Sequence, residues 1–339
     1  MILLITGIHG FVGSNLVKAL SKEHTIYGLD IISSEKEGVK YTFSWDDLDK
    51  DGLIPNVDAI IHLAGKAHDT KNQSKADVYF AINTNLTKRI YDYFLQSSAK
   101  KFIFFSSVKA AADQVKGEFV DESVIPSPKG PYGESKIAAE RYILSQPPFI
   151  SPAALELASL ATNGTQETKE ITEKDFSQAK QVYILRPCMI HGPGNKGNLN
   201  LLYGVVSKGI PWPLGAFENK RTFMSIDNLC FIISNLLTKN IESGIYHVND
   251  DEPVSTNELI EIICQAMGKK AHIWRIPKSF MTGCAKVCGW LHLPLNPERL
   301  QKLTENYISS NAKIKKALGI SQMPVRAKDG LMKTIISFQ

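Results

Sequence analysis

The stretch Gly7-Ile8-His9-Gly10-Phe11-Val12-Gly13 decides the fold. It follows directly on the strand-like run Ile2–Thr6, and it opens a helical pattern that continues to Ser21. Gly7 permits a tight turn, Gly10 lets the backbone approach a diphosphate, and Gly13 allows close packing of helix on strand. A diphosphate is favoured there because its charge faces the positive end of the helix dipole. The stretch therefore predicts a dinucleotide-binding turn between a strand and a helix.

An acidic residue follows at the expected distance. Asp30 ends the next apolar run, Thr25–Asp30, about 20 residues on, where a carboxylate accepts hydrogen bonds from ribose hydroxyls. The carboxylate repels a 2′-phosphate, and no arginine follows it immediately, so we expect NAD rather than NADP. A further strand closes with His62-Leu63-Ala64-Gly65, whose small residues leave space for the dinucleotide. We expect His62 itself to be a packed residue.

The rest of the first 190 residues repeats this alternation of strand and helix. It predicts an α/β fold with a Rossmann doubly wound parallel sheet. We expect the NAD-binding domain to span residues 1–191, with an insertion at 146–180, and a smaller mixed α/β domain at 192–339 to bind mainly the substrate. The further strands are expected at Asp58–Leu63, Lys101–Ser106 and Val182–Leu185, and the helices at Asn83–Ser97, Tyr132–Ser145, Asn257–Met267 and Pro297–Leu303.

Composition excludes several other classes of protein. The chain has 339 residues, of which 43% are hydrophobic, and its 39 basic and 34 acidic residues are interspersed, so the net charge of +5 does not favour nucleic acid as a partner. Five cysteines with no CxxC pair predict neither a disulfide framework nor a metal site. The chain starts at once with a strand, and no uncharged apolar stretch reaches the ~20 residues of a membrane span. We therefore expect a cytoplasmic protein with neither a membrane segment nor a membrane as partner.

A candidate catalytic set lies further along the chain. Tyr132-Gly133-Glu134-Ser135-Lys136 is a YxxxK pattern, which places Tyr132 and Lys136 on one face of a helix. An ammonium beside a tyrosine is expected to lower the phenol's pKa, so that Tyr132 can exchange a proton with a sugar hydroxyl during hydride transfer. Lys136 can also bind the nicotinamide ribose. Ser107 ends a strand 25 residues earlier, where its hydroxyl can polarise the reacting oxygen.

With these motifs in order, the chain resembles the extended short-chain dehydrogenases, in particular the NAD-dependent epimerase/dehydratase family. The resemblance covers nearly the whole chain apart from 146–180. It implies that Ser107, Tyr132 and Lys136 perform the redox step, that Asn83 is a structural asparagine, and that the helices at Asn83–Ser97 and Tyr132 form a homodimer face. The residues that it assigns to the dinucleotide are Gly7, His9, Gly10, Phe11, Val12, Gly13, Asp30, Leu63, Ala64, Gly65, Tyr132, Lys136 and Pro187.

A finer similarity points to a bacterial polysaccharide-pathway branch, whose members reduce a 4-keto-6-deoxy UDP-sugar or act as UDP-sugar 4-epimerases. It rests on Pro131–Lys136, Leu185-Arg186-Pro187, His191–Gly194, Lys208–Gly215 and Asn219-Lys220-Arg221. This similarity implies a UDP-linked sugar as substrate. The substrate residues that it suggests are His68, Ser107, Lys109, Asn198 and Arg221, of which Asn198 and Arg221 would hold the diphosphate.

Two departures from the motifs of the family reduce the number of reactions that we expect. The Thr-Asp-Glu set of 4,6-dehydratases is absent, since Ser106-Ser107-Val108 stands at that strand end. Ala110-Ala111-Ala112 follows the serine where usual 4-epimerases carry Tyr-Gly. We therefore expect a UDP-4-keto-6-deoxy-hexosamine 4-reductase in polysaccharide precursor synthesis. The alternatives are a 4-epimerase acting on UDP-glucose or UDP-N-acetylglucosamine and, in another class, a non-catalytic NAD-binding sensor or scaffold.

Overall fold

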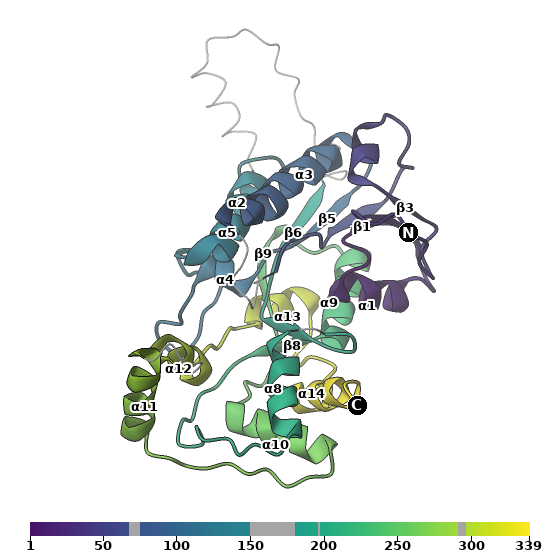
Figure 1. Ribbon diagram of the computed structural model, residues 1–339. Coiled ribbons are helices and arrows are strands. Elements are labelled where there is room, and N and C mark those ends of the chain that lie inside the picture. Colours follow the sequence, from purple (N-terminus) through teal and green to yellow (C-terminus); the bar gives the residue numbers. More distant parts are fainter. Residues whose placement is uncertain (68–74, 150–179, 196, 291–295) are drawn as a thin grey trace, which may run out of the picture. The chain divides into compact units, whose positions relative to one another are not determined.

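The computed structural model describes residues 1–67, 75–149, 180–195, 197–290 and 296–339. The chain forms two compact units, each drawn in Figure 1. Unit 1 comprises Met1–Asp113, Glu122–Arg186 and Ile232–Tyr246. Unit 2 comprises Gln114–Asp121, Pro187–Phe231 and His247–Gln339. His68 and most of the insertion expected at 146–180 lie outside the described residues.

A seven-stranded sheet with the order β3-β2-β1-β4-β5-β6-β9 forms the centre of unit 1. Parallel pairing joins the neighbouring strands from β3 through β6. The order reverses between β1 and β4, which creates the crevice where such folds bind ligands. The predicted doubly wound parallel sheet is confirmed. Its strands are β1 (Ile2–Thr6), β2 (Thr25–Leu29), β3 (Tyr41–Phe43), β4 (Ala59–His62), β5 (Lys101–Phe105), β6 (Gln181–Pro187) and β9 (Gly244–Val248).

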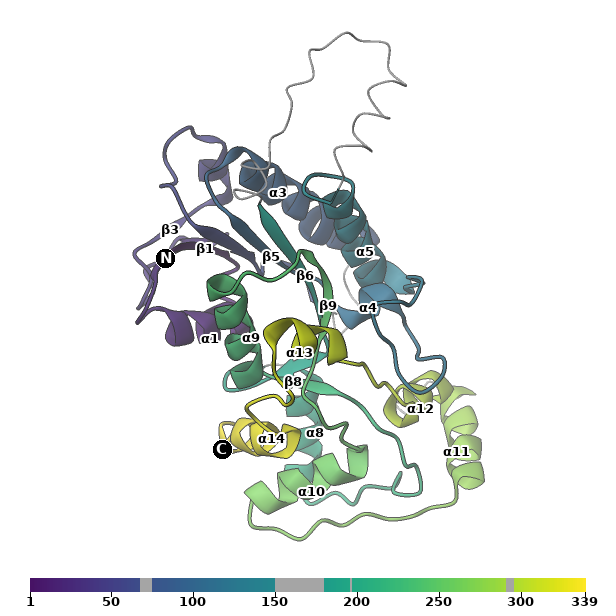
Figure 2. The same cartoon turned by 180° about the vertical axis from the view of Figure 1, so that it is seen from behind.

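Helices cover both faces of this sheet. Figures 1 and 2 show α3 (Leu86–Gln96) and α5 (Gly130–Leu144) on one face and α1 (Phe11–Leu20) and α9 (Ile226–Thr238) on the other. Because both faces are covered, the strands are continuous apolar runs rather than alternating ones. Leu3, Leu4 and Ile5, for example, are all fully buried.

The helix expected to start at Asn83 begins earlier and is irregular. Its first turn is α2 (Ala76–Tyr79), and a π-helical segment (Phe80–Asn85) joins it to α3. Polar side chains of this segment bond across to α5: the Thr84 hydroxyl donates to the Ser135 carbonyl (2.8 Å), and the Asn83 amide donates to the Ser135 hydroxyl (3.0 Å). π-helical segments are rare, and they occur frequently at functional sites.

Unit 2 is mixed α/β. Its two short strands, β7 (Met189–His191) and β8 (Phe223–Ser225), pair in parallel. An apolar core joins its helices α8, α10 and α14, including Leu199, Ile263 and Leu331. None of the described helices is long and apolar enough to cross a bilayer. The helices of unit 2 are α8 (Asn198–Ser207), α10 (Thr256–Ala266), α11 (Lys278–Trp290), α12 (Pro297–Thr304), α13 (Ala312–Leu318) and α14 (Ala327–Ile336), together with the start of α9.

Candidate active site

The carboxyl ends of the parallel strands bring most of the predicted site residues to one edge of the sheet. Gly7 follows β1, Asp30 follows β2, Leu63 follows β4 and Ser107 lies two residues past β5. Residues far apart in sequence therefore converge because parallel strands all end on the same side.

The glycine loop is packed so closely that side chains do not fit. Gly7 has φ +68°, and a Cβ there would lie 2.8 Å from the Ala64 nitrogen. A Cβ on Gly13 would lie 2.4 Å from the Gly7 carbonyl oxygen. Gly10 caps α1 without a side-chain hydrogen bond, and the first turn of α1 carries no acidic residue. Amides of a first helical turn have no acceptor within the helix, so those of Phe11, Val12 and Gly13 suit an anion such as a diphosphate.

The Asp30 carboxylate is held beside this loop. Its Oδ2 accepts the His9 amide (3.0 Å), and its Oδ1 accepts the Ile31 amide (2.8 Å). Lys36, which the sequence reasoning missed, donates from Nζ to the Ser14 hydroxyl in α1 (2.9 Å). The sequence feature that could have identified Lys36 is its position, six residues after Asp30. These contacts place one carboxylate and one ammonium next to the turn that fits a dinucleotide.

Ser107 and Tyr132 meet directly, as their spacing predicted. Their side chains are hydrogen-bonded, and the Ser107 Oγ also accepts the Lys109 amide at the start of α4 (Val108–Ala111; 3.2 Å). Lys136 lies one turn after Tyr132 on α5, with Nζ donating to the Phe105 carbonyl (2.7 Å). The three predicted catalytic side chains thus share one end of β5 and α5.

The pKa of Tyr132 differs from the sequence expectation. Burial raises it above its ordinary value, and the Ser107 hydrogen bond, which acts in the opposite direction, is the smaller effect. The Lys136 ammonium, expected to lower this pKa, instead donates to a backbone carbonyl. Burial lowers the pKa of Lys136 to about 8, while the neighbouring Glu140 opposes that shift.

A buried ion pair behind Lys136 was not predicted. Glu140, one turn beyond Lys136, accepts two hydrogen bonds from Arg186: Nε to Oε1 at 3.0 Å and Nη2 to Oε2 at 2.6 Å. The Ser106 hydroxyl also donates to Glu140. Glu140 is fully buried and Arg186 is 1% exposed. The sequence feature that could have identified Glu140 is its position four residues after Lys136, on the same helix face. Its partner Arg186 lies on β6, 46 residues further along the chain.

The turn after β4 packs against the same lysine. A Cβ on Gly65 would lie 3.0 Å from both Lys136 Nζ and Asn83 Oδ1. Asn83 fixes this turn, because its side chain accepts the Lys66 amide (2.7 Å) and donates to the Lys66 carbonyl (3.1 Å). The amides of Leu63 and Ala64 donate to the Thr6 hydroxyl on β1. The turn therefore has little freedom to move.

His62 is a packed residue. Its ring nitrogens contact the hydroxyls of Thr6 (2.7 Å) and Thr87 (2.9 Å). Burial, with a smaller contribution from the positive charge of Lys136, lowers its pKa to about 3. A neutral imidazole enclosed in this way has no route to a substrate.

The predicted substrate residues are divided between the units. Lys109, in unit 1, lies beside Ser107 and donates from Nζ to the Asp113 carbonyl (2.7 Å). Asn198 and Arg221 belong to unit 2, as does Pro187. Asn198 is the exposed first residue of α8. Arg221 is half-buried, its Nη2 lies 3.8 Å from Glu305 Oε1, and burial lowers its pKa.

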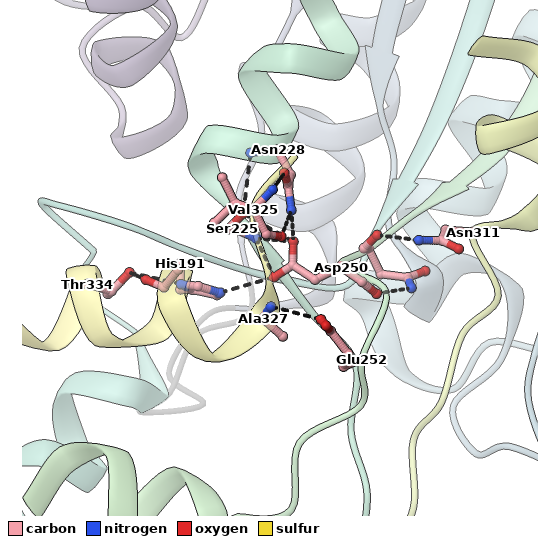
Figure 3. Close-up of polar contacts among 11 residues, drawn as sticks. His191, Ser225, Asn228, Asp250, Glu252, Asn311, Val325, Ala327 and Thr334 are labelled. Atoms are coloured by element: carbon pink, nitrogen blue, oxygen red, sulfur yellow. Dashed lines mark hydrogen bonds and ion pairs between the residues drawn. The ribbon is translucent and has the colours of Figure 1, made fainter. Parts of the chain in front are cut away.

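Unit 2 contains a second polar cluster, drawn in Figure 3. Asp250 accepts the Ser225 amide and hydroxyl (3.0 and 3.1 Å) and the Asn228 amide group (2.7 Å). His191 contacts the Thr334 hydroxyl through Nδ1 (2.9 Å), and its Nε2 lies 3.5 Å from Asp250. We call these five residues the Asp250 cluster. All of them are at most 2% exposed, so the cluster joins β7, β8, α9 and α14 internally.

Comparison with known proteins agrees with this geometry. Residues 3–147 match the model of the NAD dependent epimerase/dehydratase family. A UDP-glucose 4-epimerase of Vibrio cholerae is 29% identical over 300 residues, which cover 85% of this chain and 81% of that protein.

Solved structures share the fold. The UDP-glucuronic acid 4-epimerase from Bacillus cereus in complex with NAD superposes with a TM-score of 0.68 at 20% identity, covering 100% of this chain and 99% of that one. The Bordetella bronchiseptica enzyme WbmG in complex with NAD gives a TM-score of 0.70 at 16% identity, covering 100% and 94%. The motifs, the fold and these relatives together confirm the predicted resemblance to the NAD-dependent epimerase/dehydratase family and the prediction that the chain is an enzyme.

Proposed function

We propose that this protein is a cytoplasmic, NAD-dependent oxidoreductase acting at C4 of a UDP-linked sugar, and that it works as a 4-epimerase in polysaccharide precursor synthesis. The observation that carries the proposal is the hydrogen-bonded pair Ser107–Tyr132 with Lys136 one turn away, at the sheet edge that also holds the glycine loop. The 29% identity to a UDP-glucose 4-epimerase over most of both chains supports the choice of reaction.

The residues at the sheet edge fit the dinucleotide. The Gly7–Gly13 loop and the first turn of α1 would hold its diphosphate, since the amides of that turn have no acceptor within the helix and the turn carries no acidic residue. Asp30 would accept the adenosine ribose hydroxyls, and its charge favours NAD over NADP. Gly65, Lys136 and Pro187 would contact the nicotinamide half. When bound, NAD supplies the acceptor and donor of hydride.

The catalytic side chains move one proton. Tyr132 takes the proton of the sugar 4-hydroxyl when C4 is oxidised, and it returns a proton when the ketone is reduced. Ser107 donates a hydrogen bond to the reacting oxygen, which stabilises charge that develops there. Lys136, whose ammonium donates to the Phe105 carbonyl in this structure, would hold the nicotinamide ribose and contribute a positive charge near the phenolate. Glu140 keeps that charge on Lys136 at neutral pH, because it opposes the effect of burial.

The nucleotide of the substrate would be held by unit 2. Arg221 offers a planar fork of donors that suits diphosphate oxygens, and Asn198 is exposed at the start of α8. His68 and Lys109 would contact the sugar. We also propose a homodimer formed through α3 and α5.

A second candidate is reduction of a 4-keto-6-deoxy UDP-sugar by NADH. The observation that favours it is Ala110-Ala111-Ala112 after the catalytic serine, where usual 4-epimerases carry Tyr-Gly. The same three catalytic residues serve both reactions, since each transfers hydride at C4. An epimerase differs from a reductase in one respect. Its 4-keto sugar must rotate within the site so that hydride returns to the opposite face of C4.

The test separates the two reactions by their cofactor use. The purified protein is denatured, the released nucleotide is identified, and the native protein is assayed with UDP-glucose and UDP-N-acetylglucosamine. A 4-epimerase retains NAD and forms the galacto epimers without added cofactor. Stoichiometric oxidation of added NADH with a 4-keto-6-deoxy UDP-sugar, and no epimer, would replace this proposal by the reductase. Turnover of neither substrate class would overturn both.

A further inference from the structure

Helix α11 exposes large apolar side chains. Phe280 is 62% exposed, Val287 is 58% exposed and Trp290 is 80% exposed. Phe280, Cys284 and Val287 follow the i, i+4, i+7 spacing of one helix face, and Trp290 lies three residues further on. Exposed aromatic residues grouped on one helix are unusual, because water normally drives them inside.

These side chains are not the ones that hold α11 in unit 2. Met281 and Ala285 on the inner side are buried and pack with Leu214 and Leu300 of the same unit. The inner contacts therefore fix the helix, and they leave the outer apolar face, Phe280–Val287–Trp290, directed outward. Figures 1 and 2 both show α11 at the outer end of the long segment that follows α10.

The stretch of chain that carries this face has charges of one sign. Residues 262–297 contain no aspartate or glutamate, although acidic residues make up 34 of the 339 in the chain. The same stretch carries five basic residues. All five are exposed: Lys269, Lys270, Arg275, Lys278 and Lys286.

A fourth large apolar side chain lies in the segment before α11. Trp274 is 56% exposed. Its backbone is fixed, because the Trp274 amide donates to the Trp212 carbonyl and the Trp212 amide donates to the His272 carbonyl, both at 2.8 Å. The exposed indole is therefore presented by an ordered backbone, with Arg275 beside it.

We propose that α11 and the segment before it form a surface that binds an anionic phospholipid bilayer. Tryptophan and phenylalanine side chains enter the boundary between headgroups and acyl chains, while lysine and arginine pair with anionic headgroups. A helix of 13 residues is too short to span the bilayer and lies in its plane. A second copy of this chain is a poorer partner, since the exposed Arg275, Lys278 and Lys286 of one copy would face those of the other. This surface goes beyond the proposed function and involves none of its residues.

Vesicle binding tests the proposal without any need for turnover. The full-length protein is sedimented with phosphatidylcholine vesicles and with vesicles that also contain phosphatidylglycerol. We expect binding to the anionic vesicles that weakens as salt rises, together with a blue shift of tryptophan emission. The triple variant F280S/V287S/W290S should lose at least about tenfold in binding, because three apolar side chains no longer insert.

Matched variants distinguish vesicle binding by this face from non-specific adsorption through any exposed apolar side chain. Ile125 is 87% exposed and Ile336 is 53% exposed, and both lie outside the face. The double variant I125S/I336S should bind vesicles as the unchanged protein does. The variant R275Q/K278Q/K286Q keeps the apolar face and should lose the preference for phosphatidylglycerol.

Three results would overturn the proposal: absence of binding to the anionic vesicles, equal binding by the triple variant, or equal binding to both kinds of vesicle. Sedimentation velocity tests the alternative that a second copy of the chain binds to this face. A concentration-dependent dimer that the triple variant abolishes, without vesicle binding, would assign the face to a second copy instead. The triple variant is expected to turn over a soluble UDP-sugar at an unchanged rate. Failure of the membrane proposal can therefore be distinguished from failure of the proposed reaction.

Discussion

The proposed catalytic set of unit 1 (Ser107, Tyr132 and Lys136) and the Asp250 cluster of unit 2 both place a serine hydroxyl beside a second polar side chain, but they differ in solvent access. The Asp250 cluster has a serine, a histidine and an aspartate within contact distance, the residue types of a hydrolase triad. Its serine, however, bonds to the aspartate rather than to the histidine, and His191, Ser225 and Asp250 are 0%, 2% and 0% exposed. In unit 1, Tyr132 is only half-buried and lies at the edge of the sheet.

The difference teaches that residue types do not define a catalytic site. The Asp250 cluster satisfies its polar groups with other parts of unit 2, so it stabilises the junction of two strands and two helices. The catalytic set is also hydrogen-bonded, but its tyrosine lies at the carboxyl edge of a parallel sheet, where ligands enter. Substitutions in the two places should therefore change different measured quantities.

The largest expected effect concerns turnover. Tyr132→Phe removes the proton donor and keeps the ring, so we expect kcat to fall by about 100- to 10,000-fold with little change in the unfolding midpoint. Ser225→Ala should leave kcat within about twofold and lower stability by about 1 kcal/mol. Steady-state kinetics and thermal unfolding on both variants check this contrast. If Tyr132→Phe kept full turnover, the catalytic assignment would be wrong.

The buried ion pair should give the next largest effect, on stability. Glu140→Gln leaves the buried Arg186 without its counter-charge, which costs about 3–5 kcal/mol in the free energy of unfolding. Asp250→Asn, in unit 2, should cost about 1–3 kcal/mol, because it disturbs hydrogen bonds without leaving a strong cation alone. Urea unfolding measures both. Equal losses would remove the distinction between the two buried clusters.

The affinity for NAD should also distinguish a substitution in unit 1 from one in unit 2. Asp30→Ala should weaken NAD binding by about 10- to 100-fold, since a carboxylate that accepts two ribose hydroxyls contributes about 1.5–3 kcal/mol. Asp251, which is paired with Lys315 in unit 2 (2.8 Å), supplies the control Asp251→Ala, which should leave NAD affinity unchanged. Titration calorimetry on protein stripped of nucleotide provides the measurement. Unaltered affinity in Asp30→Ala would contradict the position assigned to the adenosine ribose.

The smallest effect is a pH dependence of stability from His62. Its pKa is about 3 in the folded protein and about 6.5 when unfolded, so between these values the unfolded state binds more protons. Stability is therefore highest above about pH 6.5 and falls with decreasing pH by up to about 1.4 kcal/mol per unit. His62→Gln should reduce the loss between pH 6.5 and pH 5 by about 2 kcal/mol. His272→Gln, at an exposed position, serves as control, and an unchanged slope in His62→Gln would refute the assignment.

Local patterns predicted much of this arrangement. The glycine loop, Asp30 and the Tyr132–Lys136 spacing are short-range signals, and the alternation of strand and helix defines the sheet that joins them. The Ser107–Tyr132 contact could be predicted because both residues sit at ends of elements. No short-range signal predicted that Arg186 pairs with Glu140, since the two meet only after β6 takes its place beside β5.

The pKa of Tyr132 could not be predicted for a related reason. Spacing places Lys136 on the same helix face, but the direction of its ammonium depends on the Phe105 carbonyl at the end of another element. The π-helical segment was missed because the side chains that favour it, Asn83 and Thr84, find their acceptors on α5. Burial and long-range hydrogen bonds, rather than local propensity, decided these points.

The order of strands also has a consequence for protein synthesis. The last strand of the unit 1 sheet, β9, is made only after residues 187–231 of unit 2 have been synthesised. Until then β6 is an edge strand, although its residues Val182, Tyr183, Ile184 and Leu185 are fully buried in the finished protein. An uncovered apolar edge invites pairing with other chains. We therefore expect a nascent chain paused before residue 244 to be prone to pairing with other chains through β6.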